Sequence, residues 1–265
     1  MRTLILSDAH LTGPADPAQP ALIAFLDAVE AADTARVVFG GDIFHAWWGR
    51  PRVQARYQDV VAAIRRLRDR GVAVVWIPGN HDFAVGPVLG ALVAETTAWT
   101  GEVAGRRWRV VHGDEADATW GYRLTRRALR GRAFAAAMRA VGPARGDALL
   151  DRLAGRSRDH MAPAARVVEA QRQWARARLG EGAQAVALGH SHALGLVQDQ
   201  RGVIVHLGDW GAQRSWLELS PAGAHLHAGW GHAPRVVGHV PPAVGVPAAP
   251  QPAALQGTPA GAEPR

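Results

Sequence analysis

The sequence predicts an α/β fold in which short buried strands alternate with amphipathic helices. Residues 2–6 and 72–77 are apolar runs with the length and composition of buried strands. Between them, apolar residues recur at helical spacing within 21–30. Each apolar run ends at Asp, Asn or His, and ligands of such sheets lie beyond the carboxyl ends of the strands. We therefore expect one site that collects these strand ends.

The same patterns predict the remaining elements in order along the chain. Further strands are predicted at 36–40, 109–111, 185–188, 203–207 and 216–219, and a second helix at 53–67. A helical, Arg-rich insertion is expected at about 115–180, within a single domain that spans 1–232. Because 8 of the 17 prolines lie in 234–265, residues 233–265 are predicted to form a disordered Pro/Ala-rich tail.

Composition excludes several classes of protein. The 265 residues include no Cys, which excludes disulfides, thiolate metal sites and a Cys nucleophile. No stretch approaches the roughly 20 apolar residues of a membrane span, and the N-terminus does not have the pattern of a signal peptide, so a cytoplasmic protein is expected. All 30 basic residues are Arg, and 121–178 hold 14 of them against 4 acids. This local excess favours a phosphate-bearing partner.

The strand ends carry a set of metal-binding residue types. Four His, two Asp and one Asn follow the predicted strands: Asp8, His10, Asp42, Asn80, His112, His190 and His192. Seven oxygen and nitrogen donors exceed the needs of one tetrahedral ion, so we expect two divalent ions that share a carboxylate. Oxygen and imidazole ligands suit Mn²⁺, with Fe or Zn²⁺ as alternatives, and paired ions of this kind serve in-line displacement at phosphorus.

The order of these motifs resembles that of the calcineurin-like metallophosphoesterases. The matching blocks are Asp8-Ala9-His10, Gly41-Asp42, Gly79-Asn80-His81-Asp82, His112 and Gly189-His190-Ser191-His192. The resemblance implies a four-layer sandwich of two β-sheets flanked by helices, with a helical lid insertion. It also implies that Asp8, His10, Asp42 and His192 hold one metal and that Asp42, Asn80, His112 and His190 hold the other. His81 and Asp82 would be catalytic, with Asp82 holding the His81 imidazole in place.

Within this family, the chain is most similar to the UDP-2,3-diacylglucosamine diphosphatases of lipid A synthesis. Ser7-Asp8-Ala9-His10-Leu11 and Gly41-Asp42-Ile43-Phe44-His45-Ala46-Trp47 match their blocks. The resemblance implies that the enzyme cleaves UDP-2,3-diacylglucosamine to UMP and 2,3-diacylglucosamine 1-phosphate. Residues of the insertion would bind that substrate: Tyr122, Arg123, Ser157 and Arg158. The chain departs from the branch at His81, where those enzymes have Arg, and at Thr119, Met161 and Ala164.

Two other functions stay open at this stage. One is a broad-specificity phosphodiesterase or phosphomonoesterase of a paralogous branch. The other is a binder of nucleic acid or anionic membrane through Arg123, Arg126, Arg127 and Arg130, which share one helical face. We expect a phosphorylated small molecule or lipid-linked nucleotide sugar as substrate and no nucleic acid or obligate protein partner, and peripheral contact with an anionic inner membrane stays open. His45 either supports the site or is a plain loop residue, and Trp47-Trp48 either line a pocket or pack in the core.

Overall fold

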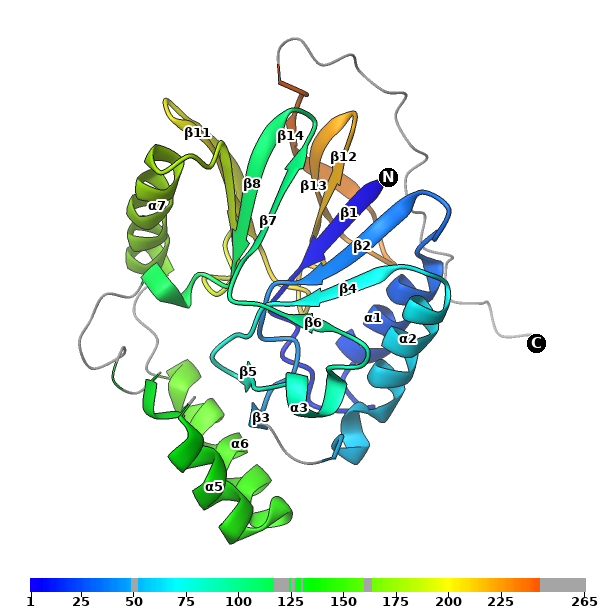
Figure 1. Cartoon of the computed structure of the whole chain (residues 1–265), viewed down its shortest axis with the longest axis vertical. Helices are drawn as coiled ribbons and strands as arrows, with labels where there is room; N and C mark the ends of the chain where they lie inside the picture. The colour runs from blue at the N-terminus through cyan, green and yellow to red at the C-terminus, as the bar shows by residue number, and fades with distance from the viewer. Residues whose placement is uncertain (49–51, 117–123, 125–126, 130, 160–163, 244–265) are drawn as a thin grey trace.

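The computed structural model describes residues 1–48, 52–116, 124, 127–129, 131–159 and 164–243. Two β-sheets lie face to face in the middle of the molecule, and helices cover their outer faces (Figure 1). The predicted α/β class and four-layer sandwich are thus confirmed. Among the described residues, no helix is both long and apolar enough to cross a membrane.

The larger sheet has seven strands in the order β14-β13-β12-β1-β2-β4-β6. Its strands are β1 (Arg2–Leu6), β2 (Thr34–Phe39), β4 (Ala73–Trp76), β6 (Ala94–Glu95), β12 (Trp216–Ser220), β13 (Gly223–Ala228) and β14 (Arg235–Val240). β1, β2, β4 and β6 run parallel, so their carboxyl ends meet at one edge. Helices α1 (Ala18–Ala28) and α2 (Gln58–Asp69) cover its outer face with apolar residues such as Leu22, Phe25 and Ile64.

The smaller sheet has five strands in the order β10-β11-β9-β8-β7. They are β7 (Trp99–Val103), β8 (Arg106–Val111), β9 (Ala185–Leu188), β10 (Leu194–Asp199) and β11 (Gly202–Leu207). β8, β9 and β11 are parallel, and helix α7 (Ala164–Gly180) packs on their outer face through Ala175 and Leu179. Apolar side chains of the two sheets, including Ile5, Val110 and Val205, fill the space between them.

Short elements surround the strand ends of the larger sheet. The two-residue strands β3 (Trp47–Trp48) and β5 (Asp82–Phe83) pair in parallel, and α3 (Gly86–Leu89) follows β5. Two 3₁₀ turns, Ala55–Tyr57 and Asp114–Ala116, precede α2 and follow β8.

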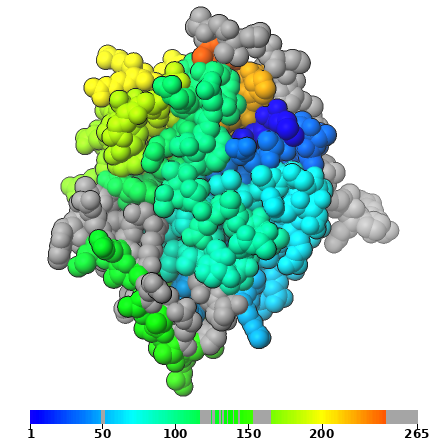
Figure 2. All heavy atoms as spheres, viewed as in Figure 1, coloured from blue at the N-terminus to red at the C-terminus, as the bar shows by residue number. Residues whose placement is uncertain are grey.

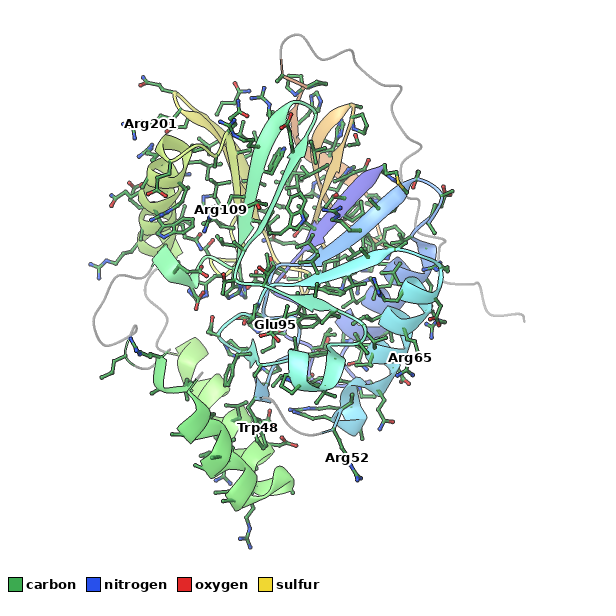
Figure 3. The ribbon with its side chains drawn as sticks, in the orientation of Figure 1. Trp48, Arg52, Arg65, Glu95, Arg109 and Arg201 are labelled. Carbon is green, nitrogen blue, oxygen red and sulfur yellow. The ribbon has the colours of Figure 1, made fainter. Side chains whose placement is uncertain are left out.

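Helices α5 (Arg132–Val141) and α6 (Pro143–Asp159) extend away from the two sheets (Figures 1 and 2). They rest on β3 and β5, where Trp48 and Phe83 pack with Met138 and Leu150. The Trp48 Nε1–H also donates to Asp147 (3.0 Å), and Figure 3 shows Trp48 between β3 and this helix pair. Helix α7 packs on the five-stranded sheet instead and is part of the sandwich. The predicted insertion at 115–180 therefore extends too far at its C-terminal end, because it includes α7.

The C-terminal boundary of the domain also needs correction. The predicted disordered tail began at residue 233, but Arg235–Val240 forms β14 at the edge of the seven-stranded sheet. β14 pairs with β13 over Ala224↔Val240 to Ala228↔Arg235. Prolines flank this strand but do not interrupt it, so proline density misplaced the boundary. The later part of the predicted tail, 244–265, lies outside the described residues.

Candidate metal centre

The loops that follow five parallel strands bring all seven predicted ligands to one place. Asp8 and His10 follow β1, Asp42 follows β2, and Asn80 follows β4 in the larger sheet. The smaller sheet contributes the loops after β8 and β9, which carry the other three predicted ligands. The loops are tied to each other by main-chain bonds, as from Asp8 N–H to Gly41 O (3.0 Å) and from His10 N–H to Asp42 O (2.9 Å). The site is therefore built where the carboxyl ends of both sheets meet.

Asp8, His10 and His192 form the first group of donors. Their ligand atoms lie within 4.8 Å of one another. The Nε2 atoms of His10 and His192 are 3.2 Å apart, and His192 Nε2 is 3.5 Å from Asp8 Oδ1. Two imidazole nitrogens and a carboxylate oxygen that converge on one point have the chemistry of a divalent cation site.

Asp42, His112 and His190 form the second group, also within 4.8 Å of one another. The predicted amide ligand joins it, because Asn80 Oδ1 is 3.2 Å from His112 Nε2. His112 Nδ1–H donates to Gly40 O (2.9 Å), which fixes the tautomer that leaves Nε2 free to bind a metal.

Asp42 lies between the two groups. Its Oδ2 is 3.4 Å from His112 Nε2 and 3.8 Å from His10 Nε2, so one carboxylate oxygen faces both sets of imidazoles. Its Oδ1 accepts the N–H of His81 (2.8 Å). This is the position that a bridging carboxylate needs.

Burial and neighbouring charges perturb the protonation of this cluster. Burial opposes the ionisation of Asp42, but the charges of His112 and His81 outweigh it and hold the pKa of that carboxyl well below its usual range. For Asp8, burial dominates and raises the pKa to about 6. Burial lowers the pKa of His190 to about 4, so its imidazole is neutral at pH 7, as a metal ligand must be. Burial opposes a charge on His112, but the carboxylates of Asp42 and Asp8 outweigh it and raise the pKa of that imidazole well above its usual range, so a divalent cation would take the place of its Nε2 proton.

The backbone at the site is unusual in its conformation. Asp8, His10, Asp42, His190 and His192 all have φ between 45° and 66°, in the left-handed region that non-glycine residues seldom adopt. The neighbouring glycines leave room for the ligands: a Cβ at Gly79 would collide with the Asp42 carboxylate, and one at Gly189 with that of Asp8. Such conformations cluster at functional sites.

Asp82 does not have the role that the family resemblance implied. Its two carboxylate oxygens accept four backbone N–H groups, those of Gly79, Asp42, Ile43 and Phe44, at 2.7–3.2 Å. Burial, followed by the charge of Asp42, raises the pKa of Asp82 to about 7, and the amide bonds limit that rise. Asp82 thus organises the loops after β2 and β4, and does not hold the His81 imidazole.

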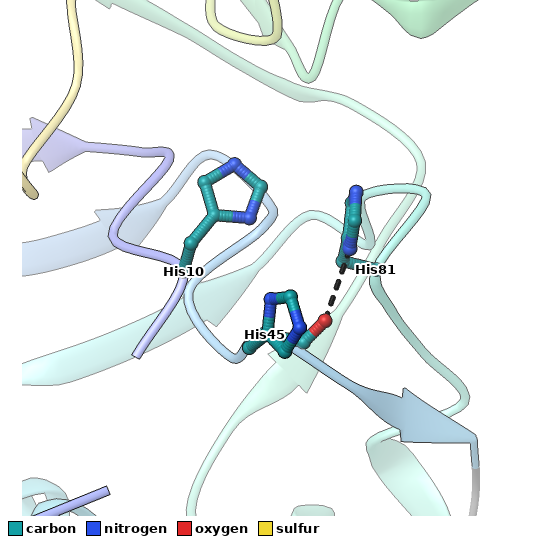
Figure 4. A group of neighbouring side chains, drawn as sticks. All are labelled: His10, His45 and His81. Carbon is teal, nitrogen blue, oxygen red and sulfur yellow. Dashed lines mark hydrogen bonds between the residues drawn. The ribbon is translucent and has the colours of Figure 1, made fainter. Parts of the chain in front are cut away.

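The partner of the His81 ring is instead the main chain of His45. His81 Nδ1–H donates to His45 O (3.0 Å), as Figure 4 shows. The His81 ring also stands at 87° to that of His10, with 4.8 Å between centroids. His45 is only 7% exposed and offers a ring nitrogen within 4.8 Å of those of His10 and His81. His45 therefore supports the site, which settles the alternative that the sequence left open.

The substrate residues predicted in the insertion cannot be placed in the same way. Tyr122 and Arg123 lie outside the described residues, as do Arg126 and Arg130 of the proposed Arg face. Ser157 and Arg158 belong to α6, but their side chains fall outside the described part.

Trp47 and Trp48 follow the core-packing alternative that the sequence left open. Trp47 packs on Phe44, with ring centroids 5.1 Å apart, and both Trp side chains are fully buried. Gln171 of α7 was not singled out, yet its side-chain amide reaches the loops that carry His112 and His190. Its helical spacing to Ala175 and Leu179 was the available signal.

Comparison with known proteins is consistent with this arrangement. Residues 1–194 match the family described as calcineurin-like phosphoesterase. The chain belongs to this family. The prediction that it is related to phosphoester hydrolases is thereby confirmed.

Individual relatives match only part of the chain. A UDP-2,3-diacylglucosamine hydrolase of Chromohalobacter salexigens is 39% identical over 101 residues, which are 36% of this chain and 39% of that protein. The enzyme of the same name from Neisseria gonorrhoeae is 36% identical over 81 residues, 31% of this chain and 34% of that protein. The chain therefore aligns with little more than a third of the length of these relatives. The solved structure of Yfce, a phosphoesterase from E. coli, covers 92% of this chain and 100% of its own, with 15% identity and a TM-score of 0.48.

Proposed function

We propose that this protein is a phosphohydrolase that uses two divalent metal ions. The observation that carries the proposal is the pair of donor groups, Asp8-His10-His192 and Asp42-His112-His190, that face each other across Asp42 Oδ2. Asn80 completes the second group. Two adjacent cations in such a site activate water and stabilise the charge of a phosphoryl group under attack. Mn²⁺ is the ion we would test first, with Fe and Zn²⁺ as alternatives.

His81 supplies the protein's own acid–base chemistry in this proposal. The His45 carbonyl holds its Nδ1–H, which leaves Nε2 on the opposite edge of the ring, beside the first donor group. In its imidazolium form, Nε2–H can bind a phosphoryl oxygen or protonate the leaving oxygen.

For the substrate, we propose UDP-2,3-diacylglucosamine. The relatives that carry this name support the choice. Phe83, two residues after His81, is buried with Met138 and Leu150, and this packing anchors the helix pair α5–α6 close to the site. The same helices expose the apolar side chains of Val141 and Leu149. Acyl chains need apolar surface of this kind, whereas a simple nucleotide does not.

The proposed reaction is hydrolysis at the α-phosphorus. Water adds to that phosphorus, and the bond to the bridging oxygen of the diphosphate breaks. The bridging oxygen leaves with the acylated sugar phosphate and takes up a proton, which gives UMP and 2,3-diacylglucosamine 1-phosphate. In this balance His81 is the candidate donor of that proton.

The test uses purified protein with Mn²⁺ and UDP-2,3-diacylglucosamine, and mass spectrometry of the products. We expect release of UMP that is lost on chelation and regained when Mn²⁺ is added back. The Asp42→Ala variant should fold, bind neither cation and release no UMP, because Asp42 serves both donor groups.

Two outcomes would change the proposal. If UMP is not released but a chromogenic phosphodiester is cleaved, the site is active and the substrate belongs to another phosphoester class. If Asp42→Ala keeps full activity and two bound cations, the two-metal assignment is wrong.

A further inference from the structure

We infer that Gln171 is a positioning residue for the second metal group, and that it links helix α7 to the two loops carrying His112 and His190. The inference rests on the proposed two-metal site. Gln171 is 0% exposed and lies on the face of α7 that packs on the five-stranded sheet, four and eight residues before Ala175 and Leu179.

The Gln171 amide bonds to both ligand-bearing loops at once. Its Nε2 is 2.8 Å from Gly189 O and 3.4 Å from Gly113 O. Since both partners are carbonyl oxygens, which only accept, the end of the side chain that faces them must be the NH₂ group. A single side chain thus spans the residue after His112 and the residue before His190.

The Gly189–His190 peptide group is held at both of its poles. Gln171 and the Ser191 N–H, each at 2.8 Å, both donate to the carbonyl oxygen, and the Asp8 carboxylate accepts the N–H of His190 at 2.9 and 3.1 Å. This peptide precedes the φ of 66° at His190, so its orientation sets where the imidazole points. Without Gln171, the carbonyl keeps only the local bond from Ser191, which turns with the same loop, so the peptide can rotate relative to α7 and the ligand can move.

Gly113 makes room for the Gln171 contact. It has a φ of +106°, and a Cβ there would lie 2.5 Å from Gln171 Nε2. The glycine therefore both permits the turn after His112 and lets the amide approach the main chain. No comparable contact reaches the first donor group from α7 among the described residues.

The matched pair Gln171→Leu and Gln173→Leu tests the inference. Gln173 lies two residues further along α7, and its side chain is exposed and bonds only to Glu169 (3.1 Å) among the described contacts. Binding of Mn²⁺ to each purified protein would be measured by isothermal titration. We expect Gln171→Leu to weaken one of the two binding steps about 10- to 100-fold, as is typical when a group that orients a metal ligand is lost. Gln173→Leu should match the wild type.

Combined variants identify which metal group is affected. Gln171→Leu should have no further effect on cation binding in a protein that already carries His190→Ala, but should keep its effect in one that carries His10→Ala. A merely structural loss would weaken both binding steps together. Thermal unfolding of the chelated proteins is the control, because it measures a loss of stability in the absence of any cation.

Each result decides between the possibilities. Unchanged binding in Gln171→Leu, or equal weakening of both steps, would overturn the inference while leaving the two-metal proposal in place. If the wild type itself does not bind two cations, the two-metal proposal fails, and the role of Gln171 fails with it.

Discussion

Replacing Asp82 by Asn would remove the carboxylate that connects the metal-binding loops while keeping the size of the side chain. Asp82 is 0% exposed, and each of its oxygens accepts two backbone N–H groups. An Asn side chain must place its NH₂ group against one of these pairs of donors. Two hydrogen bonds to a charged acceptor are then lost, and two buried N–H groups are left without a partner.

The expected cost follows from these contacts. Each hydrogen bond to a charged group contributes about 1.5–3 kcal/mol, so at about pH 8.5, above the Asp82 pKa of about 7, Asp82→Asn should lower the free energy of unfolding by roughly 3–6 kcal/mol. For a chain of this size the Tm should fall by roughly 5–10 °C. Because Asp42 N–H and Gly79 N–H are among the four donors, Mn²⁺ affinity should fall as well, by about 10- to 100-fold.

Thermal unfolding of the chelated protein measures the stability, and titration calorimetry measures the metal affinity. Asp27→Asn is the matched control: Asp27 pairs with Arg66 at the surface, with side chains 42% and 49% exposed, so its loss should cost under about 1 kcal/mol. If the Tm of Asp82→Asn stays within about 3 °C of the wild-type value, the four amide bonds do not stabilise the loops as argued.

Three further predictions concern catalysis, docking of the helices and pH. His81→Ala should keep both cations and lower kcat by about 10²–10⁴-fold, and loss of a cation by mass spectrometry would instead make His81 a ligand. Trp48→Ala, compared with Trp48→Phe, should destabilise the protein by about 3–5 kcal/mol, speed proteolysis within α5–α6 and impair the lipid substrate more than a chromogenic ester. Burial, with the charge of Arg172, lowers the pKa of His206 to about 4 in the folded protein. In the unfolded chain the same imidazole binds a proton at about pH 6.5, so a fall in pH below that value stabilises the unfolded chain. Chelated wild-type protein should therefore lose about 2 kcal/mol between pH 7 and pH 5 through this group; an equal loss in His206→Leu would contradict the assignment.

The strands that carry the site could be predicted because their sequence signals are local. β1 and β9 are largely apolar runs that are followed by an acid or an imidazole, and burial on both faces makes such runs distinct. β13 was missed for the opposite reason. Its alternation Ala224-His225-Leu226-His227 places His on the outer face, where the His227 ring stacks on Trp216 at 4.5 Å. A histidine on a half-covered face packs like an apolar residue but counts as polar in the sequence. The alternation that identifies a strand is therefore hard to recognise here.

The candidate ligands were predictable, but the groups that hold them were not. A donor type at the end of a strand is visible in the sequence, and parallel strands bring their carboxyl ends together without further information. Asp82 acts on main-chain groups up to 40 residues away, and Gln171 on carbonyls 18 and 58 residues away. Contacts to the main chain select no particular residue type in the partner, so they leave no signal in a single sequence.

Five of the seven candidate ligands have a left-handed backbone conformation, so the residues that hold their loops must also offset an energetic cost. Each such residue costs about 1–2 kcal/mol, so together they cost on the order of 5–10 kcal/mol, as much as the net stability of many domains. The cost of one can be measured away from the site at Ala104, whose φ is 54° in the two-residue turn between β7 and β8. Ala104→Gly should raise the free energy of unfolding by about 0.5–1 kcal/mol in urea titrations, since glycine relieves the strain but adds freedom to the unfolded chain.

Asn tolerates the same conformation, so Ala104→Asn should also stabilise the protein. If neither variant is more stable than the wild type, the left-handed backbone is not costly in this chain. The hydrogen bonds of Asp82 and Gln171 would then be needed only to orient the ligands. If both variants stabilise as expected, those bonds also offset strain that the site stores before any cation binds, and their loss should release the ligand loops as well as misalign them.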